Sequence, residues 1–251
     1  DAKISIFKNK LIKDIVKYSE YITFPSDRLR NYLLKYFTGL DINKTFITPH
    51  IVERDFKHNK RVRNSNILKI VYTGDVSKPR DPYNFLLALK QLVEFGENNI
   101  CVDFIGIQDI NFIELIHELS IDSVVNVKPP MNYFDSLKAI NDYEVALIIE
   151  APNLVEGIFL PTKVVDYLQS NVFIATSSPS VGVLNDLYSE NIIDYFSNID
   201  SVESIYSMLE VIMKDFKNGL LKTPAKKDIS FMEVENIIET YKNILWVCMV
   251  I

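Results

Sequence analysis

From residue 67 onward, short apolar stretches alternate with segments whose apolar residues recur every three or four positions. The short stretches are rich in β-branched residues and nearly continuously apolar, as expected for parallel strands that helices cover on both faces. Strands are predicted at 67–73, 99–107, 123–127, 144–150, 171–176 and 192–196. Helices of about 10 to 15 residues are expected between them. This alternation predicts an α/β domain built on a doubly wound parallel sheet.

The first 57 residues follow a different pattern, with helices expected at about 4–18 and 26–37, a strand at 21–26 and a loop at 46–56. One short strand and two helices cannot form an independent sheet domain, so we expect this segment to be a remnant of a larger one. The charged segment 58–66 has no apolar period and is the predicted linker. Two more helices are expected after Ile199. The predicted divisions are 1–57, 58–230 and 231–251.

The overall composition excludes some classes of protein and leaves the predicted fold unchanged. With 48% hydrophobic residues and 24% charged residues, a folded soluble protein is expected. Lys and Arg number 27 against 33 Asp and Glu, so there is no basic excess to neutralise a nucleic acid backbone. No apolar run approaches the ~20 residues that span a bilayer, and the N-terminus has no signal-peptide core.

The two cysteines also point to a reducing compartment. Cys101 and Cys248 lie in apolar surroundings, and no second Cys or His stands at metal-ligand spacing from either. Free buried thiols are therefore expected rather than a zinc site or a disulfide. We predict a cytoplasmic protein.

Candidate ligand-binding residues should follow the strands, because ligands of open parallel sheets bind outside the carboxyl ends of the strands. Only 7 glycines occur, and none forms a GxGxxG or Walker motif, so a phosphate would have to be held another way. After the first strand, Gly74 permits close backbone approach, and Arg80 presents a guanidinium suited to phosphate. The alternative is that Arg80 and Lys78 are solvated loop cations. Asp81 is expected to cap the next helix rather than bind a ligand.

A second candidate lies where the helix after the fourth strand begins. Pro161 suits the first helical position, so free amides at residues 162–164 would favour an anion. The apolar stripe of this helix leaves Thr162, Lys163 and Asp166 on the opposite face, where Lys163 could pair with a diphosphate and Asp166 could accept from ribose hydroxyls. The alternative is an ordinary ion pair between Lys163 and Asp166 on a solvated face.

A third, weaker candidate is the loop Ser180, Val181 and Gly182, whose backbone amides could face the same ligand, although helix capping by Ser180 would also explain it. The three histidines are scattered, and His117 is expected to be a helix residue rather than a base. No Ser/His/Asp or Cys/His set can be assembled, so hydrolase chemistry has no support.

Several segments together resemble the C-terminal domain of GT-B glycosyltransferases of family 4. They are YTGDVSKPRDPYNFLLAL, VDFIG, VNVKPPMNYFDSLKAINDYEVALII and FLPTKVVDYLQSNVFIAT, in that order. The front segment YITFPSDRLRNYLLKYFTGLDINKTFITPHIVE looks like the end of the family's N-terminal domain and its interdomain loop. The resemblance covers residues 10–245 and implies a Rossmann-like donor-binding domain.

The resemblance also implies roles for single residues. The donor would be a nucleotide diphosphate sugar, with retention of configuration and no obligatory metal or other cofactor. Arg80 and Lys163 match the cations on the diphosphate, and Asp166 matches the acid on the ribose. Glu156 would be the sugar-contacting acid of a paired-acid motif, but it stands ten residues before Asp166, where the family has eight. The loop from Ser180 through Val181 to Gly182 corresponds to backbone that approaches the donor.

The function this predicts is transfer of a hexose from a nucleotide diphosphate sugar to a glycan or lipid-linked acceptor. The chain would be the donor-binding part, its last helix crossing to an N-terminal domain that is mostly missing, and weakly active alone. Two alternatives stay open: a non-catalytic nucleotide-sugar or protein-binding module, favoured by Asp75 where many relatives carry arginine, and a sugar-nucleotide 2-epimerase relative. The apolar end NILWVCMVI and the N-terminal lysines would also suit a peripheral contact with the inner face of a membrane.

Overall fold

The computed structural model of the chain describes residues 2–37, 39–52, 66–76, 80–108 and 110–250. These residues form two compact units. One comprises Asp1–Val52, Ile158–Leu160 and Ile229–Ile251, and the other comprises Glu53–Gly157 and Pro161–Asp228. Most of the predicted linker 58–66, together with Lys78 and His58, lies outside the described residues.

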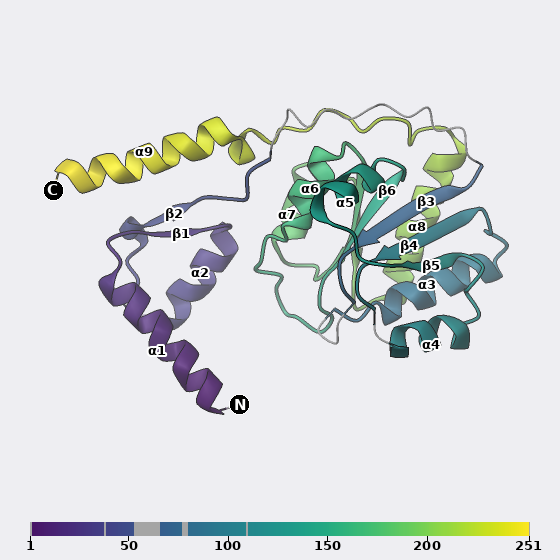
Figure 1. The fold of residues 1–251 in the computed structure, drawn as a ribbon, viewed down its shortest axis with the longest axis horizontal. Coiled ribbons are helices and arrows are strands. Elements are labelled where there is room, and N and C mark those ends of the chain that lie inside the picture. Colours follow the sequence, from purple (N-terminus) through teal and green to yellow (C-terminus); the bar gives the residue numbers. More distant parts are fainter. Residues whose placement is uncertain (1, 38, 53–65, 77–79, 109, 251) are drawn as a thin grey trace. The chain divides into compact units, whose positions relative to one another are not determined.

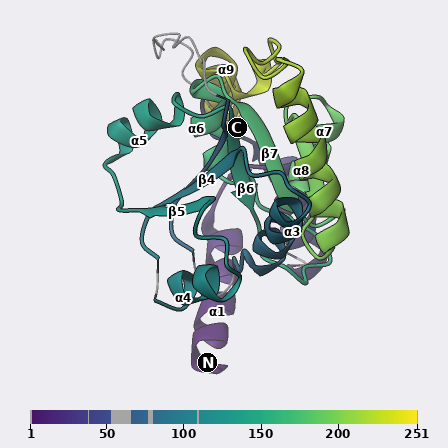
Figure 2. The same cartoon turned by 90° about the vertical axis from the view of Figure 1, so that its right-hand side faces the viewer.

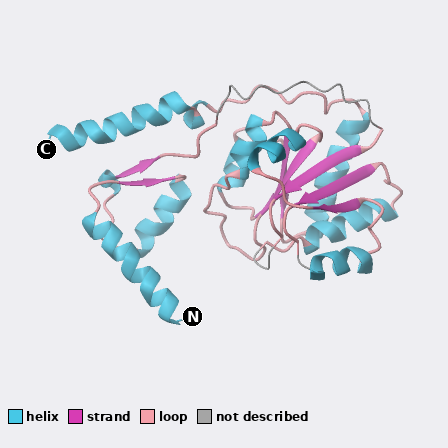
Figure 3. Cartoon of the chain, viewed as in Figure 1, coloured by secondary structure: helices cyan, strands magenta, loops and turns pink. Residues whose placement is uncertain are grey.

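The larger unit is built on a six-stranded parallel sheet (Figures 1 and 3). Its strands are β3 (Leu68–Thr73), β4 (Ile100–Ile105), β5 (Val125–Lys128), β6 (Val145–Ile149), β7 (Phe173–Ser178) and β8 (Tyr195–Asn198). Their order across the sheet is β5-β4-β3-β6-β7-β8, which is the order of a doubly wound Rossmann sheet. The predicted fold class is confirmed.

Helices cover both faces of this sheet, and Figure 2 shows α3 and α8 side by side on one of them. The helices are α3 (Tyr83–Glu94), α4 (Ile110–Glu118), α5 (Tyr133–Ile140), α6 (Lys163–Gln169), α7 (Val183–Ser189) and α8 (Val202–Lys217). Alternate residues of the central strands, such as Ile70, Tyr72 and Phe104, are buried in a core with α3, α4 and α8. On the other face, α6 packs against β6 and β7 and α7 packs against β7, which explains why these strands are apolar on both sides.

The smaller unit contains α1 (Ala2–Tyr18), β1 (Ile22–Phe24), α2 (Asp27–Tyr36), β2 (Thr45–Ile47) and α9 (Val234–Val250), with short 3₁₀ turns at Ile42–Lys44 and Ser230–Met232. Ser26 accepts from the amide of Leu29 and so caps α2, while its hydroxyl donates to the carbonyl of Ile158. The loop predicted at 46–56 is wrong at its start, because Thr45–Ile47 pairs in parallel with β1.

The last strand of the sheet also differs from its prediction at 192–196. Ile192 and Ile193 are buried, but their amides donate to the carbonyl of Leu187, which ends α7 rather than starting a strand. Pairing with β7 begins only at Tyr195. No helix in the described part of the chain is both long enough and apolar enough to cross a bilayer.

Candidate functional site

The sheet opens between its two central strands, β3 and β6. These strands pair at Ile70 with Val145 and at Val71 with Ala146, and then diverge toward their carboxyl ends. The buried hydroxyl of Tyr167 on α6 fills the opening: it donates to the carbonyl of Leu147 at 3.2 Å and accepts from the amide of Thr73 at 3.2 Å. The point where the winding direction reverses is where doubly wound sheets bind ligands.

One side of this crevice is backbone without side chains. Gly74 follows β3 with a φ of +118°, and its amide donates to the carbonyl of Ile105 at 2.7 Å. Gly106 follows β4 and passes directly against Gly74, since a Cβ on Gly106 would lie 2.4 Å from the Gly74 oxygen. The lack of a side chain at Gly106 therefore allows the ends of β3 and β4 to come this close.

Lys163, the first residue of α6, extends over this backbone. Its ammonium lies 3.7 Å from the centre of the Tyr72 ring, and a Cβ on Gly74 would stand 2.9 Å from its Nζ atom. Among the described residues, none accepts a hydrogen bond from this ammonium. Burial, and then the charge of Arg80, lower the pKa of Lys163 to about 7, against the opposing effects of Asp75 and Asp166.

Arg80 acts on the same space, although its side chain is exposed at the surface. Its charge also lowers the pKa of Tyr72 and that of Glu150, in both cases against a larger rise caused by burial. The two predicted cations thus interact, since the charge of Arg80 lowers the pKa of Lys163. Asp81 accepts from the amide of Tyr83 at 2.9 Å, but the N-cap residue of α3 is Pro82, so Asp81 lies one position before the predicted capping position.

The beginning of α6 differs from its prediction. The helix starts at Lys163 rather than Pro161 and has only 7 residues, with Thr162 as an exposed N-cap residue whose side chain makes no capping bond. The amide of Val164 donates to the carbonyl of Pro161 at 3.1 Å, and that of Val165 to Thr162 at 2.9 Å. The predicted free amide at residue 164 is therefore wrong, because a tight turn uses it.

Asp166 lies beside Lys163 at the same end of the crevice. The hydroxyl of Tyr133, at the start of α5, donates to Oδ1 of Asp166 at 3.0 Å. The negative charge of Asp166 also acts on Lys163, whose pKa it tends to raise. The predicted placement of Lys163 and Asp166 near one another is seen, but the tyrosine partner was not predicted.

Glu150, which follows β6 directly, is a site residue that sequence reasoning missed. Its Oε2 atom is fully buried and has no hydrogen-bond partner among the described residues. Burial raises the pKa of Glu150 to about 7, and only Arg80 opposes this. The available signal was a lone carboxylate ending the apolar run VALII, at the edge where ligands bind.

Two further glycines hold the wall next to Glu150. A Cβ on Gly157 would lie 2.6 Å from Oε2 of Glu150, and one on Gly182 would lie 2.7 Å from the oxygen of Gly157. The amide of Gly157 donates to the carbonyl of Val181 at 2.9 Å, and the Gly157 oxygen accepts from Val183 at 2.8 Å. The loops before α6 and before α7 are thus locked together.

The remaining predicted residues lie on these two loops. Glu156 is partly exposed immediately before Gly157. Ser180 and Val181 are exposed, and Gly182 is the N-cap residue of α7. The alternative that Ser180 caps α7 is wrong, because Gly182 is the N-cap residue; the carbonyl of Ser180 accepts from the side chain of Asn185 at 2.6 Å.

Neither His117 nor Cys101 forms part of a catalytic arrangement among the described residues. His117 stands in the last turn of α4, as expected for a helix residue, and its Nδ1 atom contacts a carboxylate oxygen of Asp122. Cys101 is a free, half-buried thiol, and burial raises its pKa to about 11. In the described residues there is no group of three or more His, Cys, Asp or Glu that could hold a metal ion.

Comparison with known proteins identifies the fold. No family model matches the sequence. Nor does any curated protein match it. Among solved structures, S. aureus TarM in complex with fondaparinux, α-GlcNAc-glycerol and UDP has a TM-score of 0.67 at 12% identity, over 94% of this chain and 46% of that one. Anabaena HepE in complex with UDP and glucose has a TM-score of 0.70 at 8% identity, over 94% and 65%.

Sucrose-phosphate synthase from Thermosynechococcus elongatus is similar with a TM-score of 0.73 at 12% identity, over 96% of this chain and 61% of that one. The three neighbours are GT-B glycosyltransferases, so the present chain has the GT-B fold, as its sequence predicted. It spans between about half and two thirds of their length.

Proposed function

We propose that this chain is the donor-binding part of a retaining glycosyltransferase, which transfers a hexose from a nucleotide diphosphate sugar to a glycan or lipid-linked acceptor. One observation carries the proposal: the partly buried ammonium of Lys163 stands over Tyr72 at the sheet's switch point, beside Arg80 and without a hydrogen-bond acceptor among the described residues. An isolated buried cation is costly, and an anionic ligand would relieve that cost.

In this proposal the diphosphate lies along the Gly74 backbone, where the missing side chain lets phosphate oxygens come close. Lys163 and Arg80 neutralise it, and their effect grows as charge develops on the leaving diphosphate. Asp166 accepts from the ribose hydroxyls. The backbone from Ser180 through Val181 to Gly182, and the amide of Thr162, complete the donor site.

The smaller unit is proposed to belong to the acceptor side of the enzyme. GT-B neighbours extend well beyond the part that this chain matches, which supports this assignment. We propose that acceptor binding depends on that additional domain, that the chain alone turns over weakly, and that the protein acts in the cytoplasm or at the inner face of a membrane. No metal is assigned to the reaction in this proposal.

A non-catalytic nucleotide-sugar or protein-binding module is the second candidate, and one observation favours it. Asp75, which follows Gly74, accepts from the amide of Ile107 at 2.8 Å. The carboxylate therefore anchors the loop after β4 and places a negative charge near the proposed phosphate site. A module that kept the fold and lost catalysis would tolerate that charge.

Calorimetric titration of the chain with UDP, GDP and ADP tests the donor site. We expect one nucleotide to bind at micromolar concentration, with binding lost in Lys163→Ala and in Asp166→Ala. Lys217→Ala is the matched control, since Lys217 pairs with Glu97 beside α8 and should leave binding unchanged. Binding of none of the three nucleotides would contradict the proposal.

Product analysis with the sugar nucleotide of the preferred base separates the remaining possibilities. Free nucleotide together with a glycoside indicates transfer, whereas an epimerised sugar nucleotide indicates the 2-epimerase alternative. Nucleotide binding with neither product, in the presence of acceptor, would favour the non-catalytic module.

A further inference from the structure

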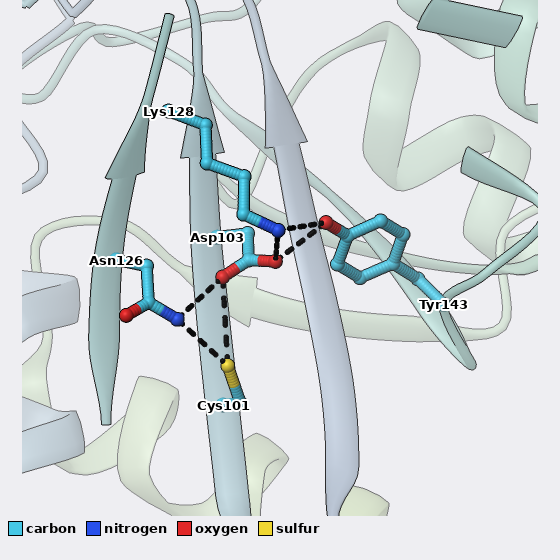
Figure 4. Close-up of polar contacts among 5 residues, drawn as sticks. All are labelled: Cys101, Asp103, Asn126, Lys128 and Tyr143. Atoms are coloured by element: carbon cyan, nitrogen blue, oxygen red, sulfur yellow. Dashed lines mark hydrogen bonds and ion pairs between the residues drawn. The ribbon is translucent and has the colours of Figure 1, made fainter. Parts of the chain in front are cut away.

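A junction of polar side chains, with Asp103 and Tyr143 buried, lies between β4, β5 and the turn before β6 (Figure 4). At its centre is Asp103 on β4, which is 3% exposed. Lys128 and Tyr143 both donate to its Oδ2 atom, at 2.6 and 2.5 Å, and Lys128 also donates to the Tyr143 hydroxyl at 3.1 Å. Asn126 and the thiol of Cys101 donate to Oδ1, at 2.8 and 3.4 Å. A buried carboxylate with this many donors is satisfied and rigid.

The junction connects the two ends of the segment that carries α5. Lys128 is the last residue of β5, and Tyr143 lies shortly before β6. Because both bind the same oxygen of Asp103, they close the two ends of segment 129–142, which carries α5. The ends of that helix are thereby fixed to the sheet.

The connection from the junction to the start of α5 is short and stiff. Two prolines, Pro129 and Pro130, follow Lys128 and restrict φ there. Asn132 then caps α5, since its side chain accepts from the amide of Asp135 at 3.0 Å. Little freedom is left in the backbone between the junction and the first residue of the helix.

That first residue is Tyr133, whose hydroxyl donates to Oδ1 of Asp166 at 3.0 Å. Tyr133 is 54% exposed, so water could satisfy its hydroxyl equally well. The bond is therefore not needed to satisfy a buried group. Its effect is to fix the rotation of the Asp166 carboxylate on the neighbouring helix.

We infer that Tyr133 is a positioning residue, held in place by the junction at Asp103, which orients Asp166 toward the ribose hydroxyls of the bound nucleotide. This inference rests on the proposed function. A carboxylate whose rotation is already fixed loses less freedom when it binds, and preorganised contacts of this kind increase affinity. Tyr133 affects nucleotide binding only by orienting Asp166.

The test compares the unmodified chain with Tyr133→Phe by calorimetric titration with the preferred nucleotide among UDP, GDP and ADP, and with its 2′,3′-dideoxy form. Because hydrogen bonds to charged groups have the larger effects, we expect Tyr133→Phe to weaken binding of the nucleotide about tenfold. Binding of the dideoxy form, which has no ribose hydroxyls for Asp166, should be the same in both proteins. A general structural role for Tyr133 would weaken both ligands equally.

The contribution of the junction is tested with Asp103→Asn, which keeps the shape of the side chain but removes its charge. Asp194→Asn is the matched control, because Asp194 accepts from Lys227 at 2.6 Å and the Ile174 amide at 2.7 Å beside the opposite edge strand, β8. We expect the folded Asp103→Asn protein to lose affinity for the nucleotide but not for its dideoxy form, and Asp194→Asn to lose neither.

Three results would overturn the inference. Unchanged nucleotide binding in Tyr133→Phe, or equal losses for both ligands, would remove the positioning role of Tyr133. Unchanged binding in a folded Asp103→Asn protein would remove the role of the junction. All three results leave the proposed function standing if Asp166→Ala still abolishes binding. Failure of the unmodified chain to bind any nucleotide would overturn the inference together with the proposed function.

Discussion

The ammonium of Lys163 lies 3.7 Å from the centre of the Tyr72 ring. A cation over an aromatic face is attracted by the ring, but this contact supplies no hydrogen-bond acceptor. Gly74 provides the room, because a Cβ at that position would nearly touch the Lys163 ammonium. The arrangement holds a cation in the crevice between β3 and β6, ready to meet an anion.

The first prediction concerns the pH dependence of nucleotide binding. The pKa of Lys163 is lowered to about 7, so above that pH the free protein must take up a proton at Lys163 to bind a diphosphate. We expect affinity for the preferred nucleoside diphosphate to fall as pH rises from 7 to 9, approaching about tenfold per unit. Titration in a series of buffers measures this.

The control is Lys163→Arg, whose guanidinium stays charged throughout this range. Its affinity should be nearly independent of pH between 7 and 9. A pH dependence that is the same in both proteins would show that another group is responsible.

The second prediction concerns Glu150 and stability. Its pKa in the folded chain is raised from 4.5 to about 7, so the unfolded chain gives up this proton at lower pH than the folded one. The favourable contribution of the protonated form is complete below pH 4.5 and is lost as pH rises through 7. Relative to the unmodified chain, Glu150→Gln should therefore gain about 3 kcal/mol of unfolding free energy at pH 8.

At pH 4, where both side chains are neutral, urea unfolding should give nearly equal free energies for the unmodified chain and Glu150→Gln. An equal difference at pH 4 and pH 8 would mean that burial of the charge is not the cause.

The third prediction concerns the close approach of Gly106 to Gly74. Gly106→Ala would place a methyl group 2.4 Å from the Gly74 oxygen, which is backbone and cannot turn away. We expect a loss of more than about 3 kcal/mol in unfolding free energy, together with weaker nucleotide binding.

Gly96 supplies the matched control, because it also has a positive φ, of +95°, but nothing lies within 4 Å of its added Cβ. Gly96→Ala should cost only about 1 kcal/mol of backbone strain and leave binding unchanged. Equal losses in the two variants would indicate that strain, and not the contact with Gly74, decides the outcome.

The fourth prediction concerns Tyr167. Removal of its hydroxyl in Tyr167→Phe leaves the Thr73 amide and the Leu147 carbonyl without their partner inside the sheet. We expect a loss of about 2 kcal/mol in unfolding free energy. Tyr206→Phe, which removes a hydroxyl bonded to Glu210 at the surface, should leave the unfolding free energy nearly unchanged.

Some features of this fold can be predicted from the sequence and others cannot, depending on whether their cause is local. The apolar strands and their order of alternation with helices are local signals, so the doubly wound sheet could be predicted. Strand β2 could not, because three residues, Thr45–Ile47, carry too little pattern, and only pairing with β1 makes them a strand. The predicted start of α6 at Pro161 is too early. Pro161 favours a helix locally, whereas the tight turn at Thr162 depends on the surrounding loops.

The site shows the same limit. Lys163, Arg80 and Asp166 could be proposed from their positions after strands and from a family resemblance. The contacts of Lys163 with Tyr72 and of Tyr133 with Asp166 join residues far apart in the sequence. No local pattern encodes such pairs. Tyr167 is instructive, because only the divergence of β3 and β6 explains its buried hydroxyl.

A crystal structure of the chain with the preferred nucleoside diphosphate tests the central claim most directly. The account predicts the diphosphate in the crevice between β3 and β6, within hydrogen-bond distance of the Lys163 ammonium, with the ribose at Asp166. A nucleotide bound elsewhere, with the Lys163 ammonium still resting on the Tyr72 ring, would contradict it.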